Sequence, residues 1–179
     1  MNKPPTVIVI TGPESCGKTT LVHELSRMLP NTRSVLEYAR EYLELKGKTV
    51  ADSAVEVMEI LSQHAQRVED YSKEPLDYII VDTDEVSHII WSDEVFGVMP
   101  ERKDYLHPKL TLLCAPDIPW IPDPMRVNPL DRDRLFERYI EELNRLKRPF
   151  EIVRGKGNQR LMEAIKHLKQ HGINVQDSL

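Results

Sequence analysis

The 179-residue sequence predicts an α/β fold in which helices cover both faces of a mostly parallel, five-stranded sheet. Short apolar runs, such as 76–81 and 110–114, alternate with longer amphipathic stretches, which is the pattern of repeated β-α units. Their continuous apolar character indicates strands that are covered on both faces. A glycine-containing segment at 12–19 directly follows the first apolar run. These observations favour a three-layer domain with a ligand site after the first strand.

Residues 12–19 fit the pattern G-x-x-x-x-G-K-[ST] at every fixed position. They lie between an apolar strand at 6–10 and a helical stretch that ends at Pro30. In this arrangement, backbone N–H groups and a helix N-terminus bind phosphate oxygens. Lys18 is expected to reach the β- and γ-phosphates, and the Thr19 hydroxyl to bind Mg²⁺. The motif predicts a P-loop NTPase that binds a nucleoside triphosphate through Gly12, Pro13, Glu14, Ser15, Cys16, Gly17, Lys18, Thr19 and Thr20.

The remaining elements follow in order. Further strands are expected at 34–37, 76–81, 110–114 and 150–153, and further helices at 38–43, 49–71, 85–96, 131–146 and 158–171. Asp131 is expected to cap the helix that it begins. The helix at 49–71 should direct an apolar stripe to the core, formed by Val55, Met58, Leu61, Ala65 and Val68. Five prolines exclude regular structure from 116–129, and we expect a lid at about 116–134.

Composition describes one soluble globular domain spanning 1–179. A formal net charge of −5 argues against nucleic acid as the main partner. No apolar run reaches membrane-spanning length, and residues 1–5 lack a signal-peptide core, so we expect a cytoplasmic protein with no membrane partner. Two cysteines, Cys16 and Cys114, do not indicate a disulfide framework or a zinc site. Cys16 is either a small residue tolerated in the loop or a thiol whose oxidation blocks the nucleotide.

Acidic residues follow three of the expected strands, at Glu37, at Asp82 with Asp84, and at Asp117. In a parallel sheet these carboxyl ends meet at the edge where ligands bind. Asp82 directly ends a buried strand, which is the position of the Mg²⁺-organising carboxylate in P-loop enzymes. Because Mg²⁺ prefers oxygen ligands, we predict Asp82 and Thr19 as its protein ligands. Capping of the following helix is the alternative, and it suits Asp84 better.

Glu37 and Asp84 are the two candidates for the catalytic base. Glu37 can accept the proton of an attacking hydroxyl or orient it. A salt bridge with Arg40, three residues later, is the alternative, and Arg40 could also position Glu37 or contact a phosphate. For Asp84 the alternatives are contact with the acceptor and a helix cap. The sequence leaves this choice open.

The proline-rich segment is expected to close over the nucleotide, exclude water and deliver Arg126 to the transferred phosphoryl group. Arg132 and Arg134 follow it, and their alternative is the solvated face of the next helix, which is the interpretation preferred for Arg134. Trp120 can anchor the lid on the core. Tyr38, Tyr42, Tyr71 and Trp91 can each stack on a planar ring in the acceptor pocket or pack in the core.

The sequence resembles the kinase domain of the NadR-type ribosylnicotinamide kinases through nearly its whole length. The resemblance rests on 12–21, on Glu37-Tyr38-Ala39-Arg40-Glu41, on Val81-Asp82-Thr83-Asp84, on Trp91-Ser92 with Phe96-Gly97, and on Asp117-Ile118-Pro119-Trp120 with Asp123 and Arg126.

The resemblance implies transfer of the γ-phosphoryl group of ATP to the ribose 5′-hydroxyl of nicotinamide riboside, an Mg²⁺-dependent step of NAD biosynthesis. In relatives the nicotinamide ring lies between two aromatic side chains, of which one matches Tyr71 and the other stands at the position of Leu36. Pro124 stands where relatives often have glycine. The expected acceptor contacts are Glu37, Tyr38, Arg40, Tyr71, Asp84, Trp120 and Asp123, and the expected catalytic residues are Lys18, Glu37, Asp84 and Arg126.

Bifunctional relatives carry an adenylyltransferase domain before the kinase, so we expect no dinucleotide synthesis from this chain by itself. The partners expected are a nucleoside triphosphate and a small-molecule acceptor; the oligomeric state stays open, a homo-oligomer included. A kinase for another nucleoside is one alternative, and a regulatory nucleotide switch is another. A switch would require a guanine-reading Asn-Lys-x-Asp segment or a glycine after Asp82, and the sequence has neither.

Overall fold

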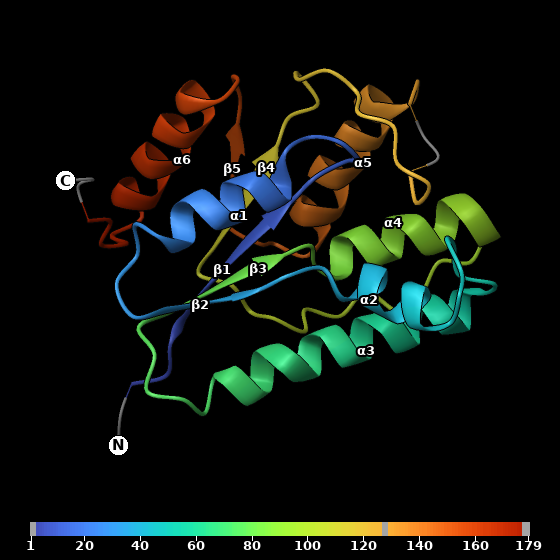
Figure 1. The fold of residues 1–179 in the computed structure, drawn as a ribbon, viewed down its shortest axis with the longest axis horizontal. Coiled ribbons are helices and arrows are strands. Elements are labelled where there is room, and N and C mark those ends of the chain that lie inside the picture. Colours follow the sequence, from blue (N-terminus) through green and yellow to red (C-terminus); the bar gives the residue numbers. More distant parts are fainter. Residues whose placement is uncertain (1–2, 127–128, 177–179) are drawn as a thin grey trace.

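The computed structural model describes residues 3–126 and 129–176. Five strands form one sheet in the order β2-β3-β1-β4-β5, and all four neighbouring pairs are parallel (Figure 1). The strands are β1 (Thr6–Thr11), β2 (Thr32–Val35), β3 (Tyr78–Asp82), β4 (Leu110–Cys114) and β5 (Phe150–Val153). The predicted fold class, a three-layer α/β domain with a parallel five-stranded sheet, is confirmed.

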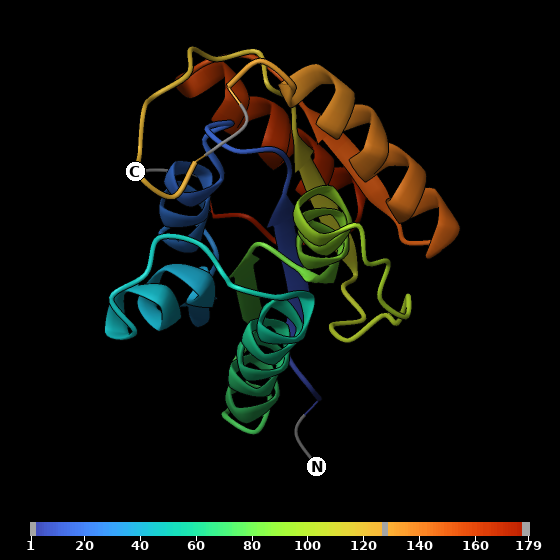
Figure 2. The same ribbon diagram turned by 90° about the vertical axis from the view of Figure 1, so that its right-hand side faces the viewer.

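Helices cover both faces of this sheet, as Figure 2 shows in an end view. On one face lie α1 (Lys18–Ser26) and α6 (Asn158–Gln170), and on the other lie α3 (Ala54–Tyr71), α4 (Glu85–Phe96) and α5 (Arg132–Arg145). The short helix α2 (Tyr38–Leu45) packs on α3. Among the described residues, no helix is both long enough and apolar enough to cross a bilayer.

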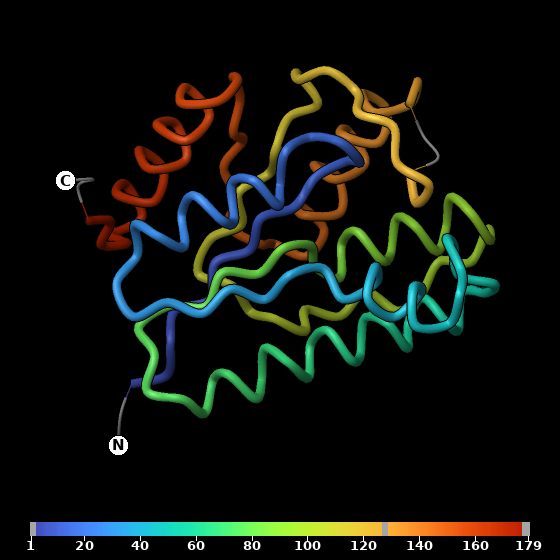
Figure 3. The backbone as a smooth tube through the Cα atoms, in the orientation of Figure 1, coloured from blue at the N-terminus to red at the C-terminus, as the bar shows by residue number. Residues whose placement is uncertain are grey.

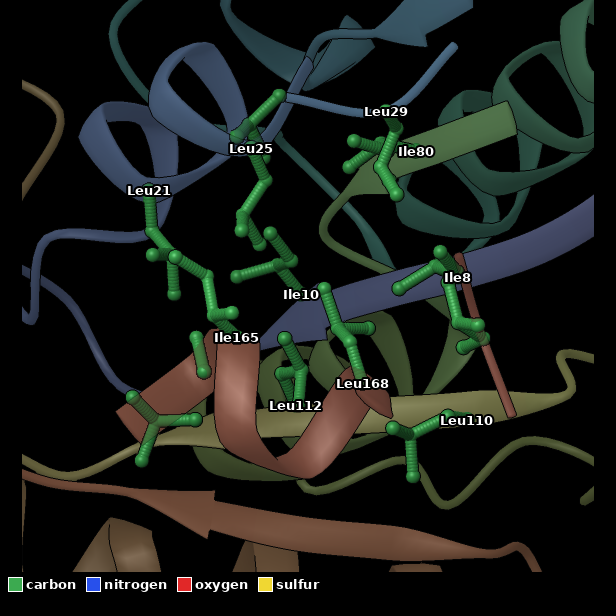
Figure 4. Close-up of a cluster of buried hydrophobic side chains, with 14 of the residues drawn as sticks. Ile8, Ile10, Leu21, Leu25, Leu29, Ile80, Leu110, Leu112, Ile165 and Leu168 are labelled. Atoms are coloured by element: carbon green, nitrogen blue, oxygen red, sulfur yellow. The ribbon is translucent and has the colours of Figure 1, made fainter. Parts of the chain in front are cut away.

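Successive side chains of each strand point to opposite faces of the sheet, so the core is divided into two layers. Ile8 and Ile10 of β1 contact the layer under α1 and α6, where Leu25 and Leu168 also pack (Figure 4). Val9, between them, joins the layer under α3. Because β1, β3 and β4 are buried along most of their length, their apolar runs in the sequence are continuous, and β1 fixes the position of the loop that follows it.

Some details of the sequence prediction differ from the structure: α3 begins at Ala54 rather than at residue 49, and β3 spans Tyr78–Asp82 rather than 76–81. The second strand is β2, at Thr32–Val35 rather than 34–37, because its register pairs Thr32 with Tyr78 and Val35 with Val81. The stripe of α3 does not include Val55, whose exposed fraction is 80%, because Val57 one half-turn away faces the core. Asp131 stands at the N-cap position of α5, but its side chain makes no capping hydrogen bond.

The segment from β4 to α5 has no regular structure in its described part, 115–126 and 129–131. Residues 127 and 128 of the expected lid lie outside the described residues. Figure 3 shows the segment leaving the end of β4, passing the loop after β1 and reaching the region of α2 and α4. It therefore lies along the carboxyl edge of the sheet.

Candidate functional site

The loop at 12–17 joins β1 to α1 and turns its backbone toward the first turn of the helix. Gly17 is the N-cap of α1 with φ of 81°, a left-handed conformation that favours glycine. The Lys18 ammonium folds over the loop and donates to the carbonyl oxygens of Gly12 and Pro13, both at 2.8 Å. The helix N-terminus and a lysine therefore converge on one concave turn, the arrangement that binds phosphate.

Thr19 and Asp82 meet across the first turn of α1 and the end of β3. The Thr19 hydroxyl donates to Asp82 Oδ2 at 2.6 Å, and the carboxylate is buried. A hydroxyl and a carboxylate oxygen beside a phosphate loop form a hard oxygen donor set that fits Mg²⁺ with its remaining waters. This contact places the two residues predicted as metal ligands next to each other.

Charge is concentrated at this edge. Although burial alone would lower the pKa of Lys18, the surrounding Cys16, Tyr139, Glu37 and Asp82 raise it, so the ammonium stays charged. Burial raises the pKa of Asp82 to about 6, and the charge of Lys18 opposes that rise. Glu37 contributes to both effects. Its carboxylate therefore lies within electrostatic reach of the predicted phosphate and metal ligands.

Of the two loop glycines, Gly12 has less space for a side chain than Gly17. Its φ is 138°, and a Cβ there would lie 2.6 Å from the Cys114 carbonyl oxygen and 3.1 Å from Cys16 Sγ. Cys16 and Cys114 are both free and buried, and both belong to the core layer under α1 and α6. The P-loop cysteine thus packs against the end of β4, which ties the loop to the sheet.

We predict that Gly12→Ala lowers the free energy of unfolding by about 2–3 kcal/mol, because backbone strain is joined by collision with a main-chain oxygen. It should also weaken nucleotide binding. Urea unfolding and titration calorimetry with ATP measure the two effects. Gly47→Ala is the matched control, since Gly47 has φ of 64° and nothing within 4 Å of the added carbon. Normal ATP binding by Gly12→Ala would contradict the prediction.

The start of α2 presents three of the predicted acceptor residues. Glu37 follows β2 and is the N-cap residue of α2, exposed at the edge of the site. Tyr38 lies under the Arg67 guanidinium, 4.3 Å from the ring centre. Arg40 donates to Asp123 at 3.0 Å, and its other described ion-pair partner is Glu44, not Glu37. The carboxylate of Glu37 is therefore not taken up by the salt bridge considered as its alternative.

Asp84 has a different environment. Its buried carboxylate accepts from the Thr11 hydroxyl at 2.8 Å, from the Ser87 amide at 3.3 Å and from Arg148 at 2.6 Å. The Ser87 bond caps α4. With both oxygens engaged in the interior, Asp84 matches the helix-cap interpretation rather than contact with an acceptor.

The predicted lid is attached to the phosphate loop. The Ile121 amide donates to Ser15 Oγ at 2.8 Å, and Arg132 donates to the carbonyl oxygens of Ser15 and Ile118 at 3.2 and 3.0 Å. The Arg132 guanidinium also lies 5.8 Å from the ring centre of Trp120. Arg126 donates to the Ile121 carbonyl oxygen at 2.7 Å, within the same segment. Trp120 and Arg126 thus lie in a segment held directly over the loop.

Tyr71 requires a correction. It is the last residue of α3 and precedes the start of β3, so it lies at the amino edge of the sheet, opposite the phosphate loop (Figure 1). There the Arg33 guanidinium stacks 5.1 Å from its ring centre, and the ring packs on a core layer. The resemblance matched a short sequence pattern, but helix direction determines which edge of the sheet the ring reaches.

Three arginines have site contacts that sequence reasoning missed. Arg132 binds the loop as described above, and Arg148 pairs with Asp84. Arg160 of α6 is buried and donates to the Cys16 carbonyl oxygen and to Asp117. No motif or spacing indicates these contacts, because each joins segments far apart in the chain. Arg134, by contrast, forms a two-point ion pair with Glu94 on the surface.

The fold and the site together define a P-loop NTPase with the architecture of nucleoside and nucleotide kinases. The family model described as an AAA domain matches residues 7–160. The chain belongs to that family. No curated protein matches it.

Among solved structures, NadR protein in complex with NR is similar with a TM-score of 0.74 at 18% identity, and NadR in complex with NAD and AMP-PNP with 0.69 at 19%. These alignments cover 98% of this chain and 53% and 52% of those chains, so the chain spans about half the length of NadR. Thymidylate kinase from Candida albicans is similar at 0.66 and 16%, covering 98% and 96%. The resemblance to NadR-type kinases is confirmed in the fold.

Proposed function

We propose that this protein is an ATP- and Mg²⁺-dependent kinase that phosphorylates the ribose 5′-hydroxyl of nicotinamide riboside. The observation that carries the phosphotransfer part is the contact of Thr19 with Asp82 beside Lys18. This constellation combines a phosphate cradle with an oxygen donor pair for Mg²⁺. Bound Mg²⁺ would neutralise charge on the phosphate oxygens.

The chain's own residues divide the remaining work. The loop amides and Lys18 would hold the β- and γ-phosphates. Glu37, exposed next to that charge, would accept the proton from the acceptor hydroxyl. Trp120 and Asp123 in the lid, with Tyr38 and Arg40 of α2, would border the acceptor, since Arg40 and Asp123 already join the two segments. Catalysis would come from positioning and electrostatics rather than covalent chemistry.

Nicotinamide riboside is supported as acceptor by the sequence resemblance and by the fold shared with NadR, whose structure was solved with NR. Another nucleoside is the second candidate, because Leu36 stands at one position where relatives carry an aromatic residue and Tyr71 lies at the opposite edge of the sheet. The alternative of another class is a regulatory ATPase switch, which would respond to no small acceptor.

The test is ADP release with ATP and Mg²⁺, with and without nicotinamide riboside, beside a panel of other nucleosides. Stimulation by nicotinamide riboside, with product of the mass of its monophosphate, would support the proposal. Stimulation by another nucleoside alone would keep the mechanism and replace the substrate. No stimulation, with ATP binding that Lys18→Met abolishes, would favour the switch.

The role proposed for Arg126, stabilisation of charge on the transferred phosphoryl group, can be tested by substitution. We expect Arg126→Ala to lower kcat by about a hundredfold or more, as loss of a group that stabilises transition-state charge does. Arg132→Ala should mainly raise KM for ATP, because Arg132 holds the lid on the Ser15 carbonyl oxygen. Steady-state kinetics of both variants separate the roles. A larger kcat loss in Arg132→Ala would reverse the assignment, and Arg134→Ala serves as the surface control.

A further inference from the structure

The guanidinium of Arg160, near the start of α6, contacts the phosphate loop and joins it to three other segments of the chain. Arg160 is 5% exposed, and its Nη1 donates to the Cys16 carbonyl oxygen in the loop. Nη2 donates to the Ala115 carbonyl oxygen at 2.9 Å and to Asp117, both of which follow β4. Nε donates to the Gly155 carbonyl oxygen at 2.8 Å, after β5. Arg160 therefore links the phosphate loop to the ends of two strands.

The positive charge of Arg160 is already paired. Asp117 accepts from Arg160 with Oδ1 and from the Gly155 amide with Oδ2, the latter at 2.7 Å. One carboxylate thus neutralises the guanidinium and attaches it to the segment before α6. Because the guanidinium is planar and rigid, its four acceptors determine its orientation. What Arg160 can contribute to phosphate binding is therefore the position of the loop rather than a free charge.

The bond to the Cys16 carbonyl oxygen determines the direction of the next N–H group. The peptide bond between Cys16 and Gly17 is trans, so its C=O and its N–H point in opposite directions. With the carbonyl oxygen turned toward Arg160, the Gly17 N–H is turned away from it. Gly17 is the N-cap of α1, where N–H groups lack a partner within the helix and bind anions. The orientation of this donor is therefore set from the carbonyl side.

The preceding peptide of the loop is held in the same way by another helix. Arg132 of α5 donates to the Ser15 carbonyl oxygen at 3.2 Å, which turns the Cys16 N–H away from that guanidinium. Arg132 also bonds the lid, through the Ile118 carbonyl oxygen at 3.0 Å. The directions of two successive donors are thus fixed by two arginines, one from the side of the lid and one from the side of the sheet.

We propose that Arg160 is a positioning residue of the nucleotide site, which holds the Cys16 carbonyl oxygen and thereby keeps the Gly17 N–H directed at the phosphates of a nucleoside triphosphate. The proposal rests on the phosphotransfer function proposed above and deepens it. A donor whose orientation is already fixed needs no ordering when the ligand binds, which is the advantage of preorganisation. Loss of Arg160 therefore weakens the contacts to the phosphates and not those to the base.

Two substitutions separate the geometry of Arg160 from its charge. Arg160→Met removes both, whereas Arg160→Lys keeps the charge but cannot reach four acceptors with one ammonium. In titration calorimetry with Mg²⁺, we expect Arg160→Met to raise the Kd for ATP and the Kd for inorganic tripolyphosphate by the same factor, about tenfold. Arg160→Lys should lie within about threefold of Arg160→Met. Wild-type affinity in either variant would overturn the proposal, and so would a loss confined to ATP, which would assign Arg160 to the base.

Leu168→Ala is the matched control for damage to the helix. Leu168 is also on α6, is 0% exposed, and lies about 12 Å further along the helix axis. Leu168→Ala should lower stability in urea unfolding but leave the Kd for ATP within about twofold. Equal losses of affinity in Leu168→Ala and Arg160→Met would attribute both to the helix and overturn the proposal. If Arg160→Met does not fold, Arg160→Lys, which can keep an ion pair with Asp117, carries the same comparison.

An NMR measurement follows the Gly17 donor itself, which a purely structural role of Arg160 would not affect. In the ¹⁵N-labelled wild-type protein, ATP with Mg²⁺ should shift the Gly17 amide proton downfield, as donation to an anionic oxygen does. At saturating ATP the shift should be smaller in Arg160→Met. Gly172, whose amide donates to the Lys169 carbonyl oxygen at 3.1 Å after α6, gives the reference signal. Equal Gly17 shifts in the two proteins would overturn the proposal.

The proposed kinase function can fail separately, because these measurements require no acceptor. If no nucleoside is phosphorylated while ATP still binds, the kinase proposal fails, and the ratio of Kd values between Arg160→Met and wild type still supports or overturns the role of Arg160. A wild-type protein that binds neither ATP nor tripolyphosphate would overturn both proposals.

Discussion

Replacing Arg148 with methionine is expected to lower the free energy of unfolding by about 3–5 kcal/mol, the cost of leaving buried charges without their partner. The Arg148 side chain is 1% exposed and donates to Asp84 at 2.6 Å, to Asp104 at 2.6 Å and to Glu85. The carboxylates of Asp84 and Glu85 are fully buried. Without the guanidinium, two adjacent negative charges would remain in the interior at the start of α4.

The loss of unfolding free energy in Arg148→Met should depend on pH in a defined direction. Burial and the charge of Asp84 raise the pKa of Glu85 to about 7 from its ordinary value of 4.5. The folded state therefore holds a proton that the unfolded state releases, so the contribution of Glu85 to stability grows as pH falls through that range. Removal of Arg148 enhances this pH dependence, because the charge of Arg148 opposes the rise in the pKa of Glu85. The difference between variant and wild type should be smaller at about pH 6 than at about pH 8.

Urea unfolding of both proteins at these two pH values measures the effect. Arg134→Met is the matched control, because Arg134 makes a comparable two-point ion pair with Glu94 on the surface, and surface pairs contribute about 0–1 kcal/mol. A loss in Arg148→Met no larger than that in Arg134→Met would mean that the buried cluster does not stabilise the fold.

The elements that the sequence predicted correctly are those determined by local pattern. The strand at Leu110–Cys114 and the helix at Glu85–Phe96 match in their bounds, since a continuous apolar run and a glycine exit fix their ends. The strand at Thr32–Val35 has a polar sequence, and pairing with β3 makes it a strand. Val55 is apolar but exposed, because the core lies on the side of Val57. Tertiary contacts, rather than local sequence, determine both the strand at Thr32–Val35 and the exposure of Val55.

The contacts of the site also fall into two kinds, those that a local sequence pattern predicts and those that it does not. The contact of Thr19 with Asp82 follows from a motif and a strand end, which place the two residues at one edge of a parallel sheet. The contacts of Ser15 with Ile121 and Arg132 join positions 106 and 117 residues apart, and no spacing rule covers them. The same holds for the neighbouring rings of His64 and His88, since only folding brings α3 and α4 together. A motif defines its own residues but not the groups packed against it.

The choice of catalytic base, which the sequence left open, leads to the largest kinetic prediction. We expect Glu37→Gln to lower kcat by about 10²–10⁴-fold, as removal of a general base does. Its effect on stability should stay within about 0.5 kcal/mol, because Glu37 is exposed. Asp84→Asn should give the opposite result. Its carboxylate is enclosed by Thr11, Ser87 and Arg148, so that variant loses stability while its folded molecules keep most of their kcat.

The two variants form a pair in which each is the control for the other. ADP release under saturating ATP and acceptor gives kcat, and urea unfolding of the same preparations gives stability and the folded fraction. A Glu37→Gln variant that keeps its kcat within about tenfold would exclude Glu37 as the base. If Asp84→Asn then lost kcat without losing stability, the proton would be accepted at Asp84, which would require α4 to shift and open that carboxylate to the acceptor, because in this structure Arg148 closes it from the interior side.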